Sequence, residues 1–471
     1  MLTVNKRGFL VAASVLSVGL ISGVGIAAAS SPTFGPATQL SSLKTYGCGL
    51  STAVGSDGTG AVAFTASSAF GPAAHVYVRR IAPTAAAFGP LMDLHTGRNA
   101  CGVSTAVAAD GTVAVGWFRL VGKTRYVEAA VARPGKAFGT VKLLQSGGSS
   151  IPLSRPKMLA TPSGFVFTWR VHVGGNSPDQ VRYATAGMAG SFAAWKVLTN
   201  KVGWPVSAVE AGNDGTLLAL YSTALPPSPA VRNSRLEQVH LAPGGSAFSA
   251  PASVATGAAV ADAYAEATLM DLQRGPGGVG VTSYEYIPSE IGTGLVRHYK
   301  YTTVASGSAF AQLADVPTSY PAYSGGGQLW QVTAGPVIAM PSGGKPVLGW
   351  TEGIDVVGDN DVVINRRMKI AVGLGDGSVT TPVEVAGLDS LAKTPVAASL
   401  GSLGIVAWEE ASKTSMRPLR YTLVSQDGTA SSKATLGTSD LRGSITIASG
   451  QSRAIAVWVS RNRVQASAIN K

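Results

Sequence analysis

Hydrophobic and polar residues alternate along residues 101–117, which read CGVSTAVAADGTVAVGW. Val103 and Val107 fall on one side of an extended segment, and a period of two residues is typical of a β-strand. The Asp-Gly pair at 110–111 predicts a tight turn, because glycine adopts positive φ and aspartate can bond its own backbone. The returning strand ends in Trp117, so the pattern predicts a β-hairpin that closes on a large apolar side chain.

The same hairpin recurs along the chain, with 50 to 66 residues between successive closing aromatic residues. These closing residues are Phe64, Trp117, Trp169, Tyr221, Tyr284, Trp350, Trp408 and Trp458. A second hairpin follows each first one, and its turn position is held by Phe88, Phe138, Phe192, Phe248, Phe310, Val379 and Ala430. Two hairpins give four strands in about 50 residues, which is the size of one β-propeller blade.

The sequence therefore predicts an all-β fold, an eight-bladed β-propeller over residues 30–471. Seven blades is the alternative, if the glycine-rich copy around Tyr284 is an insertion. The eighth copy ends after residues 463–469 without its last turn and strand, whereas residues 31–40 supply a Phe-Gly pair and a short strand. We expect this N-terminal strand to complete the last blade, because such closure removes an open sheet edge.

Residues 1–29 have the pattern of a signal peptide. Lys6 and Arg7 precede an apolar run from Gly8 to Ile26, and Ala27-Ala28-Ala29 fits a small-residue cleavage site. We expect a secreted or cell-envelope-associated protein, monomeric, with no stable membrane span after cleavage. An uncleaved membrane anchor is the alternative, because the apolar run is long for a signal peptide.

The chain is basic, with 37 Lys and Arg against 25 Asp and Glu, a net charge of +12. A basic exported protein is suited to anionic partners such as acidic glycans or wall polymers. Nucleic acid is not expected as a partner, because the sequence has no Lys/Arg run with interleaved aromatic residues. The arginine pairs at 79–80 and 366–367 fall on expected third strands and are interpreted as solvated strand faces.

The two cysteines, Cys48 and Cys101, hold equivalent positions at the start of the first strands of copies one and two. In an exported protein, such a pair predicts a disulfide between neighbouring blades. Two separate thiols are the alternative, because unsuitable geometry would forbid the bridge. A zinc site is not expected, since no histidine stands near the cysteines in sequence.

The connections that follow the second strands of copies five to seven carry acidic and aromatic residues. Connections of this kind leave neighbouring blades on one rim, so they predict a shared ligand-binding surface. Solvated surface loops are the alternative interpretation. The ligand-binding candidates are Tyr284, Glu285, Tyr286, Glu352, Asp355 and Glu409.

Metal and catalytic chemistry have less support in the sequence. Asp359 and Asp361 resemble the start of a calcium loop, since hard cations take carboxylate oxygens, but the Gly and the closing Glu of an EF-hand are missing. No cofactor is expected other than calcium at this position. Rim carboxylates would also suit a glycosidase with one acid and one nucleophile or base. No HExxH, GxSxG or P-loop pattern occurs, so no catalytic residue is identified.

The turns at 56–60 and 109–113 belong to repeats that look like those of secreted bacterial β-propellers and, distantly, of sialidases. The sialidase Asp-box reads Ser/Thr-x-Asp-x-Gly-x-x-Trp. Here Asp and Gly are adjacent and the aromatic residue is displaced, so the box is not met. The resemblance over residues 31–471 thus implies the fold and leaves the function open, because propellers host lectins, lyases, hydrolases and scaffolds.

These observations favour a secreted binding module that recognises a carbohydrate, a cell-wall polymer or a protein on one rim. One alternative is a carbohydrate-active enzyme, a sialidase-like glycosidase or a lyase, that uses rim carboxylates. A structural cell-envelope protein is the other.

Overall fold

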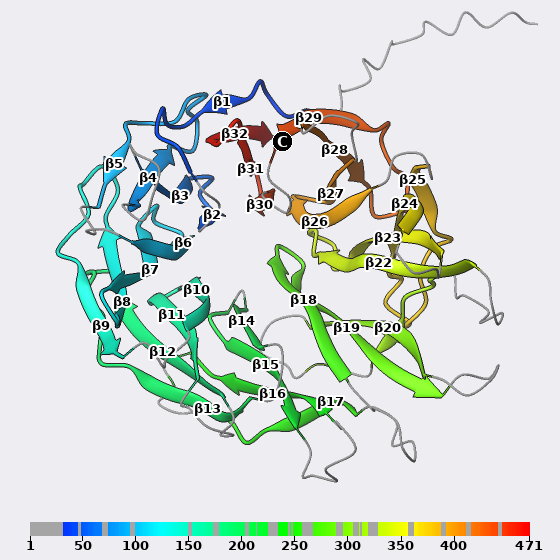
Figure 1. The fold of residues 1–471 in the computed structure, drawn as a ribbon, viewed down its shortest axis with the longest axis horizontal. Helices are drawn as coiled ribbons and strands as arrows, with labels where there is room; N and C mark the ends of the chain where they lie inside the picture. The colour runs from blue at the N-terminus through cyan, green and yellow to red at the C-terminus, as the bar shows by residue number, and fades with distance from the viewer. Residues whose placement is uncertain are drawn as a thin grey trace, which may run out of the picture. The chain divides into compact units, whose positions relative to one another are not determined.

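The computed structural model shows eight four-stranded antiparallel sheets that form the blades of one β-propeller (Figure 1). All eight lie in one compact unit, Thr33–Lys471. The copy around Tyr284 forms a complete blade, so the prediction of eight blades is confirmed and the alternative of seven is wrong. The structure describes residues 32–45, 49–67, 74–94, 99–148, 153–172, 179–202, 207–212, 214–224, 234–243, 245, 248–256, 267–288, 295–304, 310, 313–318, 328–356, 362–387, 392–410, 416–440 and 445–471.

In each blade the first strand lies innermost and the later strands follow outwards (Figure 1). Blades one and two contain β2 (Leu50–Val54), β3 (Gly60–Ala66), β4 (His75–Ile81), β5 (Met92–Asp93), β6 (Ala100–Val107), β7 (Val113–Val121), β8 (Thr124–Ala132) and β9 (Lys142–Gly147). Blades three and four contain β10 (Leu153–Thr161), β11 (Gly164–Val171), β12 (Asp179–Gly187), β13 (Lys196–Val202), β14 (Ser207–Ala211), β15 (Leu217–Ala224), β16 (Ser234–Leu241) and β17 (Ala252–Thr256).

Blades five and six contain β18 (Ala267–Gly275), β19 (Gly278–Pro288), β20 (Leu295–Val304), β21 (Ala314–Asp315), β22 (Gln328–Ala339), β23 (Val347–Val356), β24 (Val362–Val372) and β25 (Val383–Ala386). Blades seven and eight contain β26 (Lys393–Leu400), β27 (Leu403–Glu409), β28 (Arg417–Val424), β29 (Ala434–Ser439), β30 (Thr446–Ser449), β31 (Arg453–Ser460), β32 (Arg463–Asn470) and β1 (Thr38–Gln39).

The N-terminal strand completes the last blade, as predicted from the sequence. Strand β1 pairs antiparallel with β32, with Thr38 opposite Ala466. A buried arginine ties this blade to the first one, because Arg453 donates hydrogen bonds to the backbone carbonyls of Ala82 and Ala85 at 2.6 and 2.9 Å. The ring is therefore closed both by strand pairing and by side-chain contacts.

The Asp-Gly turns have the predicted structure. Gly58 adopts a φ of 88°, and the carboxylate of Asp57 accepts hydrogen bonds from the backbone N–H and the hydroxyl of Thr59 at 2.9 and 2.6 Å. These aspartates thus serve the turn itself. The same pairing recurs at Asp110–Thr112, Asp214–Thr216, Asp376–Ser378 and Asp427–Thr429.

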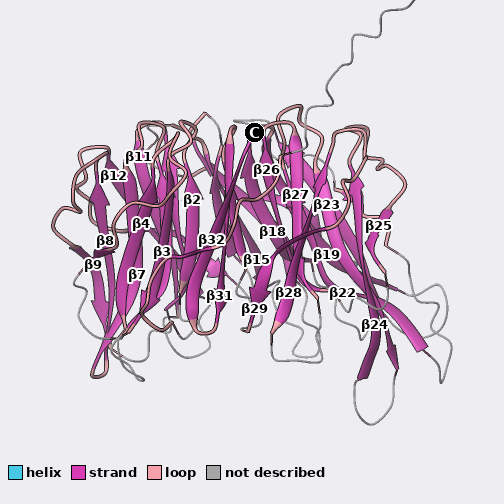
Figure 2. Cartoon of the chain, turned by 90° about the horizontal axis from the view of Figure 1, so that it is seen from above, coloured by secondary structure: helices cyan, strands magenta, loops and turns pink. Residues whose placement is uncertain are grey.

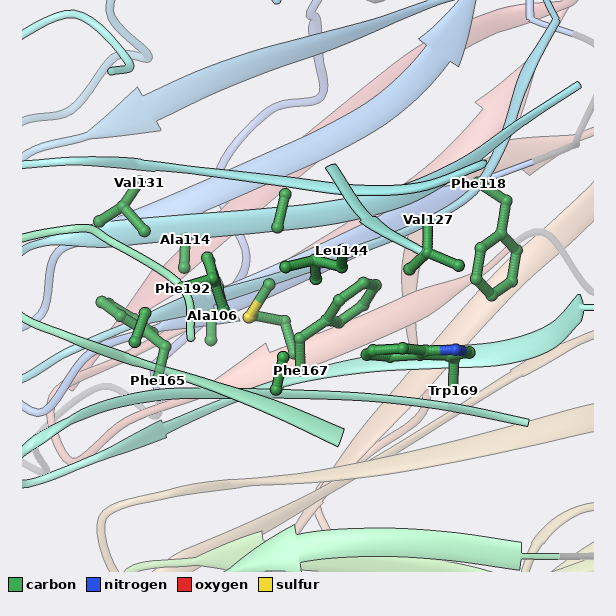
Figure 3. Packing of buried hydrophobic residues seen from close by; sticks show 14 of the residues in the cluster. Ala106, Ala114, Phe118, Val127, Val131, Leu144, Phe165, Phe167, Trp169 and Phe192 are labelled. Atoms are coloured by element: carbon green, nitrogen blue, oxygen red, sulfur yellow. The ribbon is translucent and has the colours of Figure 1, made fainter. Parts of the chain in front are cut away.

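Aromatic residues of the second strands fill the space between blades, although several strands, such as β7 and β23, continue beyond the aromatic residue that the sequence pattern placed at the strand end. Trp169 is buried against Phe118, Val127 and Leu144 of the preceding blade (Figure 3). Its indole N–H donates to the Gln145 side-chain oxygen of that blade at 2.7 Å. Burial of such large side chains supplies much of the apolar contact that holds neighbouring blades together. Among the residues whose side chains are described, the fully buried tryptophans are Trp117, Trp169, Trp350, Trp408 and Trp458.

The strands run between two rims (Figure 2). One rim carries the turns between first and second strands, such as 55–59 and 162–163, and is here named the turn face. The opposite rim carries the connections from second to third strands and is named the loop face. Residues 1–29, the predicted signal peptide, lie outside the described residues. Within the described residues, no helix is long and apolar enough to cross a membrane.

Candidate functional site

Glu352, one of the candidates for the loop face, is fully buried inside blade six. Its Oε1 accepts a hydrogen bond from the Trp350 indole at 2.8 Å. Its Oε2 lies 2.9 Å from Nη2 of Arg367 and 3.0 Å from Nζ of Lys369, both on the neighbouring strand β24. The carboxylate therefore has an indole and two cations as partners within its own blade.

Glu409 has a similar position in blade seven. It is fully buried, and its Oε2 lies 3.9 Å from Nη1 of Arg417. The adjacent Glu410 accepts hydrogen bonds from Arg420 and Lys433, each at 2.9 Å. Burial opposes the ionised form of Glu410, but these two hydrogen bonds and the nearby positive charges lower its pKa below the ordinary value.

The other candidates for the loop face are only partly described. Tyr284 is half-buried in β19, with its ring centroid 6.2 Å from that of Tyr299. The backbones of Glu285 and Tyr286 continue β19, and that of Asp355 lies in β23, but their side chains fall outside the described part of the chain. Asp359 and Asp361 fall outside it altogether. The structure thus gives Glu352 and Glu409 separate partners in separate blades, and the shared ligand surface stays a prediction.

The disulfide also stays a prediction, because Cys48 lies outside the described residues. Cys101 lies near the start of β6. The segments around the two cysteines are close, since a Cβ placed on Gly49 would lie 2.8 Å from the backbone nitrogen of Val103. Among the described residues, no group of three or more His, Cys, Asp or Glu could hold a metal ion.

A polar cavity lies in the central channel, where the eight inner strands meet. Its volume is about 260 Å3, and its lining includes residues of every inner strand. Short polar side chains connect neighbouring strands in the first blades: Ser51 Oγ accepts from the backbone N–H of Thr105 at 3.1 Å, and Ser104 Oγ from that of Met158 at 2.8 Å. The hydroxyl side chains thus form links between inner strands.

Blade three departs from this pattern. Met158 donates to Ser104 as Thr105 donates to Ser51, so Met158 and Thr105 hold equivalent positions. The residue before Thr105 is Ser104, whereas the residue before Met158 is Lys157. A lysine therefore stands in blade three where blade two has a serine. Its Nζ lies 3.1 Å from Oε2 of Glu210 on β14, and 42 % of the lysine side chain is exposed, whereas Glu210 is buried. The negative charge of Glu210 raises the pKa of Lys157, although burial opposes that shift. Both oxygens of Glu210 are engaged, because Oε1 accepts from the Ala211 backbone N–H at 3.2 Å.

Blade five adds three polar residues from β18. Asp271 accepts hydrogen bonds from the Ile338 backbone N–H at 3.1 Å and from the Gln273 amide at 2.9 Å. Burial raises the pKa of Asp271, and these bonds offset only part of the effect. Arg274 donates to the Ala160 carbonyl of blade three at 3.2 Å, and burial lowers the pKa of its guanidinium. We name Lys157, Glu210, Asp271, Gln273 and Arg274 the inner-strand cluster.

A second cavity, of about 410 Å3, lies at the turn-face end of the channel. Its lining includes the turn residues Gly55, Ser56 and Pro162. Arg274 lines both this mouth and the inner cavity, and it is the charged residue that the two linings share. The inner-strand cluster is therefore a candidate site on the side of the turn face, and the ligand surface expected on the loop face stays a prediction.

Known proteins resemble this chain in structure and not in sequence. No family model matches the chain, and no curated protein sequence matches it. Among solved structures, a polysaccharide lyase of family PL25, an ulvan lyase bound to -[GlcA(1-4)Rha3S]-, is 11 % identical, covers 93 % of this chain and 95 % of its own, and has a TM-score of 0.45.

Two further similar structures belong to other classes of propeller. The WD40 domain of SCAP from fission yeast is 9 % identical, covers 93 % of this chain and 98 % of its own, and has a TM-score of 0.43. An N11 neuraminidase-like protein of A/flat-faced bat/Peru/033/2010 (H18N11) is 10 % identical, covers 94 % and 93 %, and has a TM-score of 0.38. Similarity at this level carries no argument about activity.

Proposed function

We propose that this protein is an exported binding module that takes a polar chain, a glycan or a cell-wall polymer, into its central channel from the turn face. The observation that carries the proposal is the inner-strand cluster. It places charged and amide side chains around a cavity, and Lys157 among them stands at the position where blades one and two carry Ser51 and Ser104.

The lining of the cavity is suited to a ligand with many hydroxyl groups. Gln273, Lys157 and Arg274 line the inner cavity together with serine and threonine side chains. Ser399 is 1 % exposed, lines the same cavity, and has no hydrogen-bond partner for its hydroxyl within the described residues.

The proposal assigns no catalytic step to the site. Glu210 would be the nearest carboxylate for acid or base chemistry, but its two oxygens bind Lys157 and the Ala211 backbone. The positive net charge of the chain agrees with an acidic polymer as the partner.

A glycan and wall-polymer array probed with residues 30–471, with and without calcium, tests the proposal. We expect selective binding that is lost in Gln273→Ala and kept in Gln39→Ala, a matched change on the exposed strand β1. Glu285→Gln tests the loop face. Loss of binding in Glu285→Gln, with Gln273→Ala unaffected, would move the site to that face.

Two other outcomes would replace the proposal. No binding to any saccharide or wall polymer would favour a protein partner or a structural role in the envelope. Cleavage of a bound saccharide, followed by chromatography of the products, would show a carbohydrate-active enzyme instead.

A further inference from the structure

The charged residues that line the channel indicate a class of ligand, and this assignment rests on the proposed function of the channel as a binding site. The charged residues in the inner lining are Lys157, Glu210 and Arg274. The carboxylate of Glu210 is bonded through both oxygens, whereas the lysine bonded to it keeps 42 % of its side chain exposed. The lining therefore presents positive charge toward the cavity.

Asp271 adds little opposing charge to the cavity. Its carboxylate is turned into the contact between blades five and six, where it binds the Ile338 backbone and the Gln273 amide. Burial raises the pKa of Asp271, and its hydrogen bonds and the nearby charge of Lys157 oppose that shift. The oxygens of Asp271 are therefore occupied by these donors, and the residue does not belong to the cavity lining.

Arg274 has the position that an anion receptor requires. It lies at the end of β18, where a Cβ on Gly275 would lie 2.1 Å from the Met340 carbonyl and 2.7 Å from Ser399 Oγ. The close packing holds the backbone of Gly275, and the exposed side chain of Arg274 is held by its hydrogen bond to the Ala160 carbonyl of blade three, where it lines both the mouth and the inner cavity. A fixed planar guanidinium recognises carboxylate and phosphate groups with favourable geometry.

We infer that the channel binds an oxyanion carried by a hydroxyl-rich chain, with the anion between Arg274 and Lys157 and the hydroxyl groups toward the serine-lined inner cavity. The oxyanion is a carboxylate or a phosphate, because the same pair of cations serves either group. A uronate-containing saccharide and a polyol-phosphate polymer are the two sources of this chemistry.

Calorimetric titration of residues 30–471 with three probes tests the inference. The probes are an oligomer of uronic acid, the same oligomer with its carboxyl groups reduced to alcohols, and a glycerol-phosphate oligomer of similar length. We expect one of the two anionic probes to bind at least about tenfold more tightly than the neutral one, which corresponds to about 1.4 kcal/mol. The anionic probe that binds identifies the source.

Substitutions then locate the anion. Arg274→Gln and Lys157→Gln should each weaken binding of the anionic probe about tenfold or more, and the affinity of both variants should depend less on salt. Arg133→Gln, which removes an exposed arginine outside the lining, is the matched control and should change the affinity less than about twofold. Circular dichroism checks that each variant is folded, and if Arg274→Gln does not fold, Lys157→Gln carries the test.

The outcomes separate this inference from the proposed function. Equal binding of the acidic and the reduced oligomer, unchanged in Lys157→Gln, would overturn the anion site and leave the saccharide-binding proposal standing. Binding of the glycerol-phosphate oligomer that is lost in Arg274→Gln, with no saccharide bound, would support the anion site and exclude the saccharide. No binding of any probe would overturn both.

Discussion

Glu352 and Glu210 are both buried carboxylates paired with a cation, but their surroundings differ. Glu352 lies inside a blade, between an indole N–H and two cations that are mostly shielded from water. Glu210 lies on an inner strand, and its partner Lys157 extends into the channel. The first carboxylate holds strands β23 and β24 together, whereas the second belongs to a cavity surface. Two acids with similar burial thus hold strands together in one region and line a cavity in another.

Blade two repeats the first arrangement with residues at other positions. Glu128 on β8 accepts a hydrogen bond from the Trp117 indole at 2.9 Å and pairs with Arg119. Glu352 lies on the same strand as Trp350, two residues after it. Glu128 lies on β8, the strand next to that of Trp117. The common element is the buried indole N–H, which needs an acceptor when it is removed from water.

The largest effect is expected for Glu352→Ala. Removing this carboxylate leaves Arg367 and Lys369 without their buried partner, so the free energy of unfolding should fall by about 3–5 kcal/mol. Urea denaturation measures the change. Glu384→Ala is the control, because Glu384 contacts the same arginine at 3.5 Å but is 43 % exposed, and it should cost less than about 1 kcal/mol. Equal losses in both variants would contradict the assignment.

The indole hydrogen bonds provide a second test of the comparison. Trp350→Phe removes a donor to the carboxylate of Glu352, a charged acceptor, and should cost about 1.5–3 kcal/mol through that bond. Trp169→Phe removes a donor to the neutral amide of Gln145, and the lost bond should cost about 0.5–1.5 kcal/mol. Both measurements use chemical denaturation, and a larger loss in Trp169→Phe would reverse the expected order.

Glu210→Gln should have a smaller effect on stability. Glutamine keeps an oxygen for the Ala211 N–H, and Lys157 keeps contact with water, so we expect a change of at most about 1 kcal/mol. Thermal and urea denaturation of the variant beside Glu352→Gln measure the contrast. A loss as large as that of Glu352→Gln would mean that the channel pair is also a structural element of the ring.

The smallest effect is expected at an exposed carboxylate. The hydroxyl of Ser425 and the backbone N–H of Thr429 donate to Asp427 and lower its pKa from the ordinary value of 3.8 to about 2. Because the folded pKa is depressed, this stabilisation is present above about pH 4 and is lost as the pH falls through about 2. NMR titration of the Asp427 carboxyl carbon measures the pKa. A midpoint near 4 in the folded protein would contradict the prediction.

The fold could be predicted because its signals are local and repeated. Alternation defines each strand, Asp-Gly pairs mark the turns, and the missing last strand of the eighth copy matches the extra strand at residues 31–40. The candidate site could not be predicted in the same way. Strand β23 continues to Val356, so Glu352 belongs to the sheet and not to the connection after it. Its partner Arg367 lies 15 residues further along the chain. The alternation of hydrophobic and polar residues predicts both strands but not which residues lie opposite each other.

A signal for the channel residues was present in the repeats. When the copies are aligned by their inner-strand contacts, Lys157 falls at the position of Ser51 and Ser104. A long charged side chain at a position that is serine in the other two copies indicates that packing between strands does not determine the residue type there. Such positions become visible only when the register of the inner strands is known, because the turns of blades one and three differ in length.

The pairing of β1 with β32 joins the part of the propeller that is synthesised first to the part that is synthesised last. Blade eight is complete only when β1 pairs with β32, so the ring stays open until β32 has been synthesised. Closure of so long a loop is slow compared with the formation of a single hairpin. Until the two strands pair, the outer edge of β32 is open to other extended segments, and β1 covers it when the ring closes.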